Sequence, residues 1–172
     1  MAPDSSPPYK IRTHCPGDMG LIINRHAVFY EQLLGWGPGF EIDVARVAVD
    51  FLDNFDPNLE RAFIAESIET SELIGSAALF KHRKEANTAQ LRLLLVDAAA
   101  RGTGLGTKLF ARESGYAKIA LWTFSTLEGA RRLYQRAGFQ LVSTSKEQDH
   151  WGVKMNLELW ELALSSTEGQ ST

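Results

Sequence analysis

The feature that most constrains the fold is an apolar segment followed closely by a glycine-rich loop. The segment is Gln90–Val96, QLRLLLV, and the loop is Arg101–Gly106, RGTGLG. A nearly continuous apolar run of this length is typical of a central strand that is covered on both faces. The pattern after the loop predicts a helix over Leu105–Ser114, which Gly115 ends. Strand, loop and helix in this order indicate an α/β domain with a parallel crossover.

The chain before this crossover predicts one strand and two amphipathic helices. Tyr9–His14 alternates as a strand does, and Asp18 follows a Pro-Gly turn, where a carboxylate would cap a first helix. An apolar stripe on that helix, which Gly35 ends, consists of Ile22, His26, Phe29 and Leu33. A second helix is expected over Glu41–Asn54, and its buried side is formed by Val44, Val47, Ala48, Phe51 and Phe55.

Strands dominate the rest of the chain. Apolar or alternating runs predict them at Arg61–Glu66, Leu73–Phe80, Ile119–Phe124, Gln140–Thr144 and Asn156–Leu164. One more helix is expected where Ser125 and Glu128 have the spacing of a capping box, and Gly138 ends it. We therefore expect one folded domain over residues 9–164, with polar, disordered tails at residues 1–8 and 165–172.

Composition excludes several classes of protein. The 172-residue chain has one cysteine, Cys15, which has no partner for a disulfide within the chain and fits a reducing compartment. Its net charge of −3 lacks the basic surplus that is typical of nucleic-acid binding. Its apolar runs are too short to cross a bilayer, and no secretory leader is evident. These observations predict a cytoplasmic domain that binds neither nucleic acid nor membrane.

The glycine loop has the properties of an anion site. Free amides of a first helical turn and the positive end of the helix dipole meet there. Without Cβ atoms, the backbone can approach a diphosphate at Gly102, Gly104 and Gly106. Arg101 adds a positive charge, and Thr103 or Thr107 a hydroxyl. Two nucleotide-binding motifs do not match, because both the P-loop and the dinucleotide fingerprint, counted from Gly102, require glycine at Thr107.

Arg101–Gly106 instead resembles the acyl-CoA signature of the GNAT superfamily of N-acyltransferases. Leu94–Asp97 stands where the family has its bulged fourth strand, and Leu133–Phe139, LYQRAGF, resembles its second signature. A narrower resemblance, to the acetyltransferase domains fused to MarR-type regulators, rests on Pro16–Gly20, Arg25–His26 and Leu121–Thr123. The resemblance implies an α/β fold with a mixed, mostly antiparallel sheet of about seven strands, about four flanking helices and one parallel βαβ crossover.

The resemblance also implies an N-acetyltransferase that uses acetyl-CoA as its acyl donor and no metal. The residues expected to bind this donor are Leu94, Leu95, Val96, Arg101, Gly102, Thr103, Gly104, Leu105, Gly106 and Thr107. A backbone N–H around Leu95–Val96 would hold the acyl carbonyl and face the developing oxyanion. Tyr134 would protonate the departing CoA thiolate. The structural alternative for Tyr134 is a core aromatic on the buried side of its helix.

The acceptor is expected to be a small-molecule amine or a peptide. His26, Tyr30 and Trp151 are the candidates that line its pocket. His26 alternatively packs in the core, and Trp151 alternatively forms a contact in a homodimer. The general base stays open among Glu66, Glu72, Asp97, His150 and a chain of waters.

Three departures from the family pattern matter. Ala98 replaces a usual proline, and Phe124 replaces an asparagine that contacts the cofactor. The helix after the loop is about two turns shorter than usual, so it covers less of the sheet. This predicts lower stability than in relatives, and it leaves apolar surface that either is hidden in an oligomer, such as a homodimer, or stays exposed. Phe124 and the short helix favour an alternative function, a catalytically silent acyl-CoA-binding or interaction domain.

Overall fold

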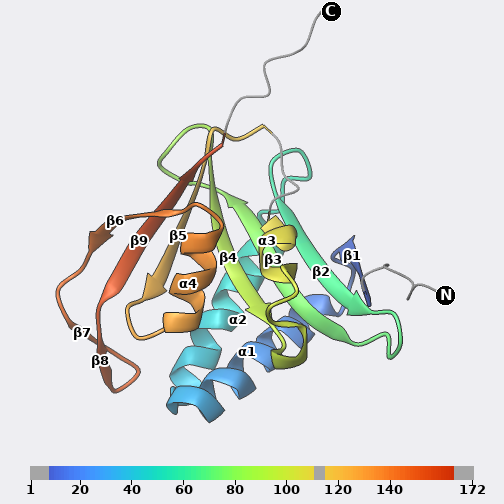
Figure 1. Cartoon of the computed structure of the whole chain (residues 1–172), viewed down its shortest axis with the longest axis horizontal. Helices are drawn as coiled ribbons and strands as arrows, with labels where there is room; N and C mark the ends of the chain where they lie inside the picture. The colour runs from blue at the N-terminus through green and yellow to red at the C-terminus, as the bar shows by residue number, and fades with distance from the viewer. Residues whose placement is uncertain (1–7, 111–114, 165–172) are drawn as a thin grey trace, which may run out of the picture.

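The chain forms a seven-stranded mixed sheet with helices on both faces (Figure 1). The computed structural model describes residues 8–110 and 115–164. The order of the strands in the sheet is β1-β2-β3-β4-β5-β9-β6. Their bounds are β1 Tyr9–Thr13, β2 Arg61–Ser67, β3 Leu73–Lys81, β4 Thr88–Val96, β5 Lys118–Phe124, β6 Gln140–Thr144 and β9 Leu157–Ala163. β4 and β5 pair in parallel and all other neighbours pair antiparallel, which confirms the predicted mixed sheet with one parallel crossover.

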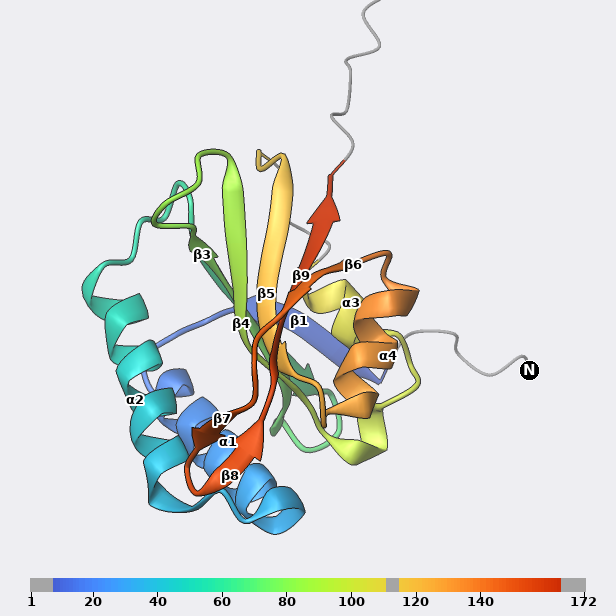
Figure 2. The ribbon, with the colours of Figure 1, turned by 90° about the vertical axis from the view of Figure 1, so that its left-hand side faces the viewer.

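The helices form two layers, one on each face of the sheet. In the described residues they are α1 Asp18–Leu34, α2 Gly37–Asp53, the 3₁₀ turn η1 Ala98–Ala100, α3 Leu105–Phe110 and α4 Glu128–Arg136. α1 and α2 lie on one face, and α3 and α4 on the other (Figure 2). The last part of the predicted helix Leu105–Ser114, residues 111–114, lies outside the described residues, as do residues 1–7 and 165–172 of the predicted tails.

Each face of the sheet has its own apolar core. One core joins the sheet to α3 and α4 and includes Leu91, Leu105, Leu109, Tyr134 and Trp160. The other joins the sheet to α1 and α2 and includes Ile22, Trp36, Val44, Phe51 and Phe80. Full burial of one such side chain contributes about 1.5–3 kcal/mol. The sheet therefore separates two packed layers of helices, and each layer forms one side of the site.

The start of α1 differs from the prediction. Gly17, with a left-handed φ of 99°, precedes the helix, and no side chain caps it. The Asp18 carboxylate accepts hydrogen bonds of 2.7 Å from the Cys15 amide and 2.7 Å from Arg12 Nη1 instead. The predicted cap is wrong because Arg12, on β1, reaches this carboxylate and forms an ion pair with it.

Three smaller predictions about the helices are also wrong. Leu33 is exposed, because the buried residues of α1 all lie in its first three turns. α2 begins at Gly37 rather than four residues later, since Pro38 fits the first turn of a helix. α4 begins at Glu128 without a side-chain cap, and the Ser125 amide bonds to a backbone carbonyl beside β9.

The parallel pair at the centre of the sheet is short. Thr88–Gln90 of β4 pairs with Lys118–Ala120 of β5, and the two strands do not pair beyond these residues. β4 nevertheless stays paired with β3 as far as Val96, and β5 with β9 as far as Phe124. The two strands therefore diverge toward their carboxyl ends, as Figure 1 shows. We call this divergence the splay.

The core beneath α2 gives a test of the packing. Phe51 is 1% exposed and contacts the rings of Phe55 and Phe80. We expect Phe51→Ala to lower the free energy of unfolding by about 3–5 kcal/mol, because it leaves a cavity. Leu52→Ala is the matched control: this side chain is 52% exposed, so its loss should change stability by no more than about 0.5 kcal/mol. Urea denaturation measures both, and equal effects would contradict the described packing of α2.

Candidate active site

The splay coincides with a β-bulge in β4. Opposite the segment from Ser76 to Ala78 of β3, β4 has one extra residue. Leu93 has a left-handed φ of 54°, and its carbonyl accepts a hydrogen bond of 2.8 Å from Ser76 Oγ. The bulge therefore lies at Leu93 and Leu94, and its predicted position around Leu95–Val96 is wrong, because the Ser76 hydroxyl fixes the Leu93 carbonyl. A bulge increases the twist of its strand, which helps to turn the end of β4 away from β5.

The glycine loop follows β4 after the short turn η1, and its backbone has the conformation that the sequence predicts. Gly102 and Gly104 have φ of 78° and 79°, a conformation that side chains with Cβ rarely adopt. A Cβ at either position would meet no other atom within 4 Å, so the backbone is open to an approaching group. Gly106 serves packing instead, because a Cβ there would lie 3.0 Å from Leu133 Cδ2 of α4.

The polar side chains of the loop are engaged by the protein. Thr103 Oγ1 donates a hydrogen bond of 2.6 Å to the Ala100 carbonyl. Arg101 Nε donates to the Val96 carbonyl at 3.0 Å, and its guanidinium lies 4.8 Å from the centre of the Phe29 ring on α1. The predicted positive charge thus stands at the loop, and a cation–π contact holds it against the opposite helical layer.

The remaining residues expected to bind the acyl donor differ in how far their side chains are exposed. Leu105 is 1% exposed within the α3 and α4 core, and Leu95 is also buried, so each offers mainly backbone groups. Leu94, Val96 and Thr107 are partly buried. The structure therefore places all of the predicted donor residues along the end of β4 and the start of α3.

A second contact ties α1 to the loop. Arg25 Nη1 lies 2.6 Å from Asp97 Oδ2, immediately after β4. Phe29, one turn later on α1, supports Arg101. The loop that follows β4 is thus held on both sides, by its own helix α3 and by α1.

Tyr134 lies on α4 at the donor side of the sheet. Its side chain is buried and packs against the rings of Phe139 and Trp160, at centroid distances of 5.6 Å and 6.5 Å. Burial raises the pKa of Tyr134 above its ordinary value, and the neighbouring Tyr30 raises this pKa further. The phenol therefore keeps its proton at neutral pH and can act as a proton donor. The hydroxyl makes no hydrogen bond with the described residues.

Tyr30, on α1, connects the donor and acceptor sides. Its ring stacks on Trp36, with centroids 4.7 Å apart and planes 9° apart. Burial raises the pKa of Tyr30 to about 12, and the positive charge of Arg101 opposes this rise. The Tyr30 ring also lies 4.9 Å from the ring of Phe29, which contacts Arg101, so Tyr30 joins the glycine loop to Trp36.

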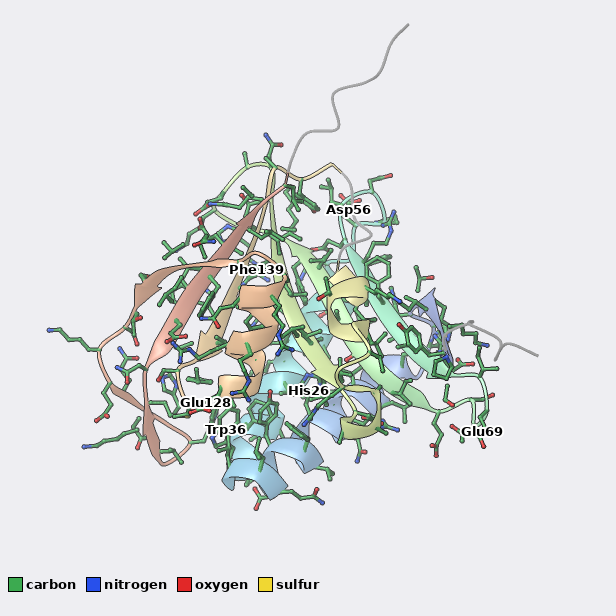
Figure 3. The ribbon with its side chains drawn as sticks, in the orientation of Figure 1. His26, Trp36, Asp56, Glu69, Glu128 and Phe139 are labelled. Atoms are coloured by element: carbon green, nitrogen blue, oxygen red, sulfur yellow. The ribbon has the colours of Figure 1, made fainter. Side chains whose placement is uncertain are left out.

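His26 lies one turn before Tyr30 and is 5% exposed. Its Nδ1 is 2.8 Å from the Ile22 carbonyl, so Nδ1 carries the proton and Nε2 has a free lone pair. Burial lowers the pKa of His26 to about 4, although this hydrogen bond opposes the shift. His26 is therefore neutral at physiological pH. Figure 3 shows His26 and Trp36 toward the end of the sheet where β4 and β5 diverge.

Aromatic side chains from four segments meet on the α1 and α2 side of the splay. We call Tyr30, Trp36, Phe40, Phe124, His150 and Trp151 the aromatic cluster. Phe124, the last residue of β5, lies 5.4 Å from Trp36 and 4.9 Å from His150 between ring centroids. Trp151 lies 4.8 Å from Trp36, and its Nε1 donates to Asp43 Oδ2 of α2 at 2.9 Å. The side chain that replaces the usual asparagine thus packs among aromatic rings.

Sequence reasoning singled out Tyr30, Phe124, His150 and Trp151 for separate reasons, but it missed Trp36 and Phe40 and did not predict that these side chains form one cluster. Trp151 lies on a hairpin of two short strands, β7 Gln148–His150 and β8 Val153–Met155, which the sequence did not predict. One feature of the sequence could have indicated the cluster. In the segment GWGPGF, Trp36 and Phe40 stand among the glycines and the proline that end one helix and start the next.

Most candidates for the general base are engaged elsewhere. Glu66 pairs with Lys10 and Arg12 on the β1 side of the sheet, and Asp97 pairs with Arg25. Glu72 belongs to the exposed turn between β2 and β3. His150 alone of these four belongs to the aromatic cluster, and its buried Nε2 has no hydrogen-bond partner in the described part of the chain.

A hollow of about 600 Å³ lies elsewhere on the molecule. It is lined by parts of α2, β4, β5 and β9, including Arg92 and Trp122, and contains none of the predicted site residues. Residues 8–110 and 115–164 contain no group of three His, Cys, Asp or Glu side chains placed to hold a metal ion. Within the same ranges, no helix has the length and apolarity to cross a membrane.

Comparison with known proteins agrees with this geometry. Residues 25–139 match the model of the acetyltransferase (GNAT) family. The mycothiol acetyltransferase of Mycobacteroides abscessus is 30% identical over 135 residues, which are 74% of this chain and 43% of that protein. The chain thus spans less than half the length of this curated relative.

Two solved structures are similar in fold. The ribosomal-protein-alanine N-acetyltransferase of Brucella melitensis superposes with a TM-score of 0.70 at 20% identity, covering 90% of this chain and 99% of that one. The spermidine N-acetyltransferase of Vibrio cholerae, in complex with CoA and spermine, gives a TM-score of 0.67 at 18% identity, covering 91% and 95%. At these identities the likeness concerns the fold alone.

The burial of His26 predicts how stability depends on pH. Its folded pKa of about 4 lies below the ordinary value of 6.5, so the unfolded chain binds a proton first as the pH falls. The contribution of His26 is complete above pH 6.5 and is lost as the pH falls toward 4. Between pH 7 and pH 5 we expect a loss of about 2 kcal/mol from this residue. Denaturation of His26→Gln should show a shallower pH dependence than the parent protein, and an unchanged slope would contradict the buried, neutral histidine.

Proposed function

Because the chain belongs to the acetyltransferase (GNAT) family, we propose that it transfers an acetyl group from acetyl-CoA to an amine. The single observation that carries this proposal is the splay, which ends at a glycine loop on one side and at the aromatic cluster on the other. The acceptor is a small-molecule amine or a peptide. As parts of the same proposal, the protein is cytoplasmic, forms a homodimer, and binds neither nucleic acid nor membranes.

On the donor side, the loop offers its backbone to the diphosphate of CoA. The left-handed Gly102 and Gly104 allow close approach, and Arg101 supplies a positive charge beside them. The backbone of β4 beyond Gln90 has no partner in β5, so its free groups are available to the acyl arm. The whole set of proposed donor residues is Leu94, Leu95, Val96, Arg101, Gly102, Thr103, Gly104, Leu105, Gly106 and Thr107.

The reaction follows as a direct attack. The amine nitrogen forms a bond to the thioester carbon, and the carbon–sulfur bond breaks. A backbone N–H near the bulge of β4 stabilises the oxyanion, and one such donor is typically worth about 3–4 kcal/mol of barrier. Tyr134 gives its proton to the departing thiolate. The buried, protonated state of Tyr134 supports this role.

The acceptor must lose a proton before it attacks, because alkylamines have pKa values near 10. His150 is the one side chain among the four candidate bases that lies in the aromatic cluster, and a chain of waters is the alternative. His26, Tyr30 and Trp151 form the acceptor side in this proposal. The names of the similar proteins point to three different acceptors, mycothiol, the alanine of a ribosomal protein and spermidine, so they do not select an acceptor here.

Two finer interpretations belong to this proposal. The narrower likeness to acetyltransferase domains fused to MarR-type regulators stays a prediction from the sequence. The alternative function, a catalytically silent acyl-CoA-binding domain, is favoured by Phe124, whose ring packs in the aromatic cluster where a polar contact to the donor is usual. Binding of CoA without thiol release on any amine would favour this alternative.

The role of Tyr134 gives the decisive test of catalysis. Tyr134→Phe removes only the hydroxyl, so we expect kcat to fall about 10²–10⁴-fold, as for loss of a general acid, while KM for acetyl-CoA changes little. Tyr9→Phe is the matched control, because the Tyr9 hydroxyl is buried on β1 without a partner among the described residues. Thiol release measures both variants. An unchanged kcat in Tyr134→Phe would remove this residue from the mechanism.

A further inference from the structure

We infer that the aromatic cluster takes a monoamine acceptor with a planar, apolar body and a carbonyl-type oxygen, and that it rejects polyamines. This inference rests on the proposed acetyl transfer, since it names the acceptor class of that site.

The position of the cluster places it opposite the donor loop. Phe124 ends β5 at the open end of the splay and belongs to the core on the α1 and α2 side. Tyr134 belongs to the core on the α3 and α4 side. Tyr30 links the cluster to the donor loop, because it stacks on Trp36 and its ring also lies 4.9 Å from the Phe29 ring, which contacts Arg101. An amine held in the cluster therefore faces a thioester that enters the splay from the donor side.

The walls of the cluster are flat and apolar. Trp36 lies 4.7–5.4 Å from Tyr30, Phe40, Phe124 and Trp151 between ring centroids. Rings at such distances pack in stacked and edge-to-face arrangements that a planar ligand can continue. Sites of this kind bind the apolar body of a ligand and use a few polar groups to orient it.

Two polar atoms in the cluster are buried without a partner among the described residues. They are Trp36 Nε1 and His150 Nε2. Trp36 is 3% exposed, and an indole N–H can only donate. Buried polar groups are nearly always hydrogen-bonded, so an unpartnered donor at a binding site calls for a ligand that brings an acceptor atom. A carbonyl-type oxygen on the amine substrate provides it.

The carboxylates that border the cluster are already occupied. Asp43 accepts from Trp151 Nε1 through Oδ2 and pairs with Arg46 through Oδ1 at 3.0 Å. Glu31 Oε2 accepts from the Gly37 amide at 2.6 Å. A polyamine carries several ammonium groups, each of which requires an acceptor when it leaves water. Because Arg46 compensates the charge of Asp43, this carboxylate attracts an ammonium group weakly, and a monoamine fits better than a polyamine.

The hairpin of β7 and β8 is the side of the aromatic cluster at which the ring of an acceptor can enter. It lies outside the main sheet, and its turn consists of Trp151 and Gly152, both with left-handed φ. A tryptophan in this conformation is strained and is held by its contacts. Its ring lies so close to Gly39 that a Cβ there would be 3.0 Å from Trp151 Cδ1. An acceptor ring that takes the place of the Trp151 ring against Trp36 exchanges one aromatic contact for another, and Trp151 Nε1 then gives up its hydrogen bond to Asp43 Oδ2.

The experiment compares two acceptors that differ in one group. L-Phenylalaninamide and phenethylamine share a primary amine and a phenyl ring, and only the first has a carboxamide oxygen. Because their basicities also differ, the deciding quantity is the change in their kcat/KM ratio between variants. Trp36→Phe keeps a ring but removes Nε1, so we expect the ratio to fall about 10-fold. Trp122→Phe makes the same change at a half-exposed tryptophan outside the cluster and should leave the ratio unchanged.

The outcomes separate this inference from the proposed function. A higher kcat/KM for spermidine than for both phenyl amines, or an unchanged ratio in Trp36→Phe, would overturn the inference while leaving acetyl transfer intact. If no amine releases CoA, the proposed function fails, and calorimetric binding of the two phenyl amines to the CoA-loaded protein decides the inference. Tighter binding of L-phenylalaninamide that is lost in Trp36→Phe supports it, and equal binding overturns it.

Discussion

The structure depends on the early end of the pairing between β4 and β5. After three paired residues, each strand keeps its outer neighbour and gives up the other, so the backbone of β4 beyond Gln90 has no partner in β5. Backbone groups without a partner are costly when buried. The bulge at Leu93 turns β4 away, and the cores on the two faces keep the divided sheet together. A substrate arm that pairs with the freed edge restores the missing hydrogen bonds.

The helix α1 makes this opening useful, because it contacts both sides of it. Arg25 pairs with Asp97 just after β4, and Phe29 supports Arg101 in the glycine loop. The next residue, Tyr30, turns to the aromatic cluster and stacks on Trp36. Three positions within two turns of one helix thus join the donor loop to the acceptor side. A change in the position of Arg101 when the acyl donor binds would therefore change the surroundings of Tyr30.

Local patterns predicted the sheet and the backbone of the glycine loop well, because these depend on short-range rules. An apolar run predicts a buried strand, and Gly102 and Gly104 adopt the left-handed backbone for which glycine is suited. The errors arise where distant residues decide. Asp18 forms an ion pair with Arg12 of β1 instead of capping α1. The position of the bulge in β4 is fixed by a hydrogen bond from Ser76 of the neighbouring strand. The aromatic cluster joins Tyr30, Trp36 and Phe40 to Phe124 and to the distant pair His150 and Trp151, so no single window of the sequence contained it.

The central claim is that the thioester lies in the splay, between Tyr134 and the aromatic cluster. A crystal structure with bound acetyl-CoA tests it most directly. We expect the diphosphate to lie at Gly102–Gly104. The acetyl oxygen should lie within about 2.7–3.1 Å of a backbone N–H of β4, and the thioester sulfur beside the Tyr134 hydroxyl. Acetyl-CoA bound in the hollow lined by Arg92 and Trp122, with an unoccupied splay, would contradict it.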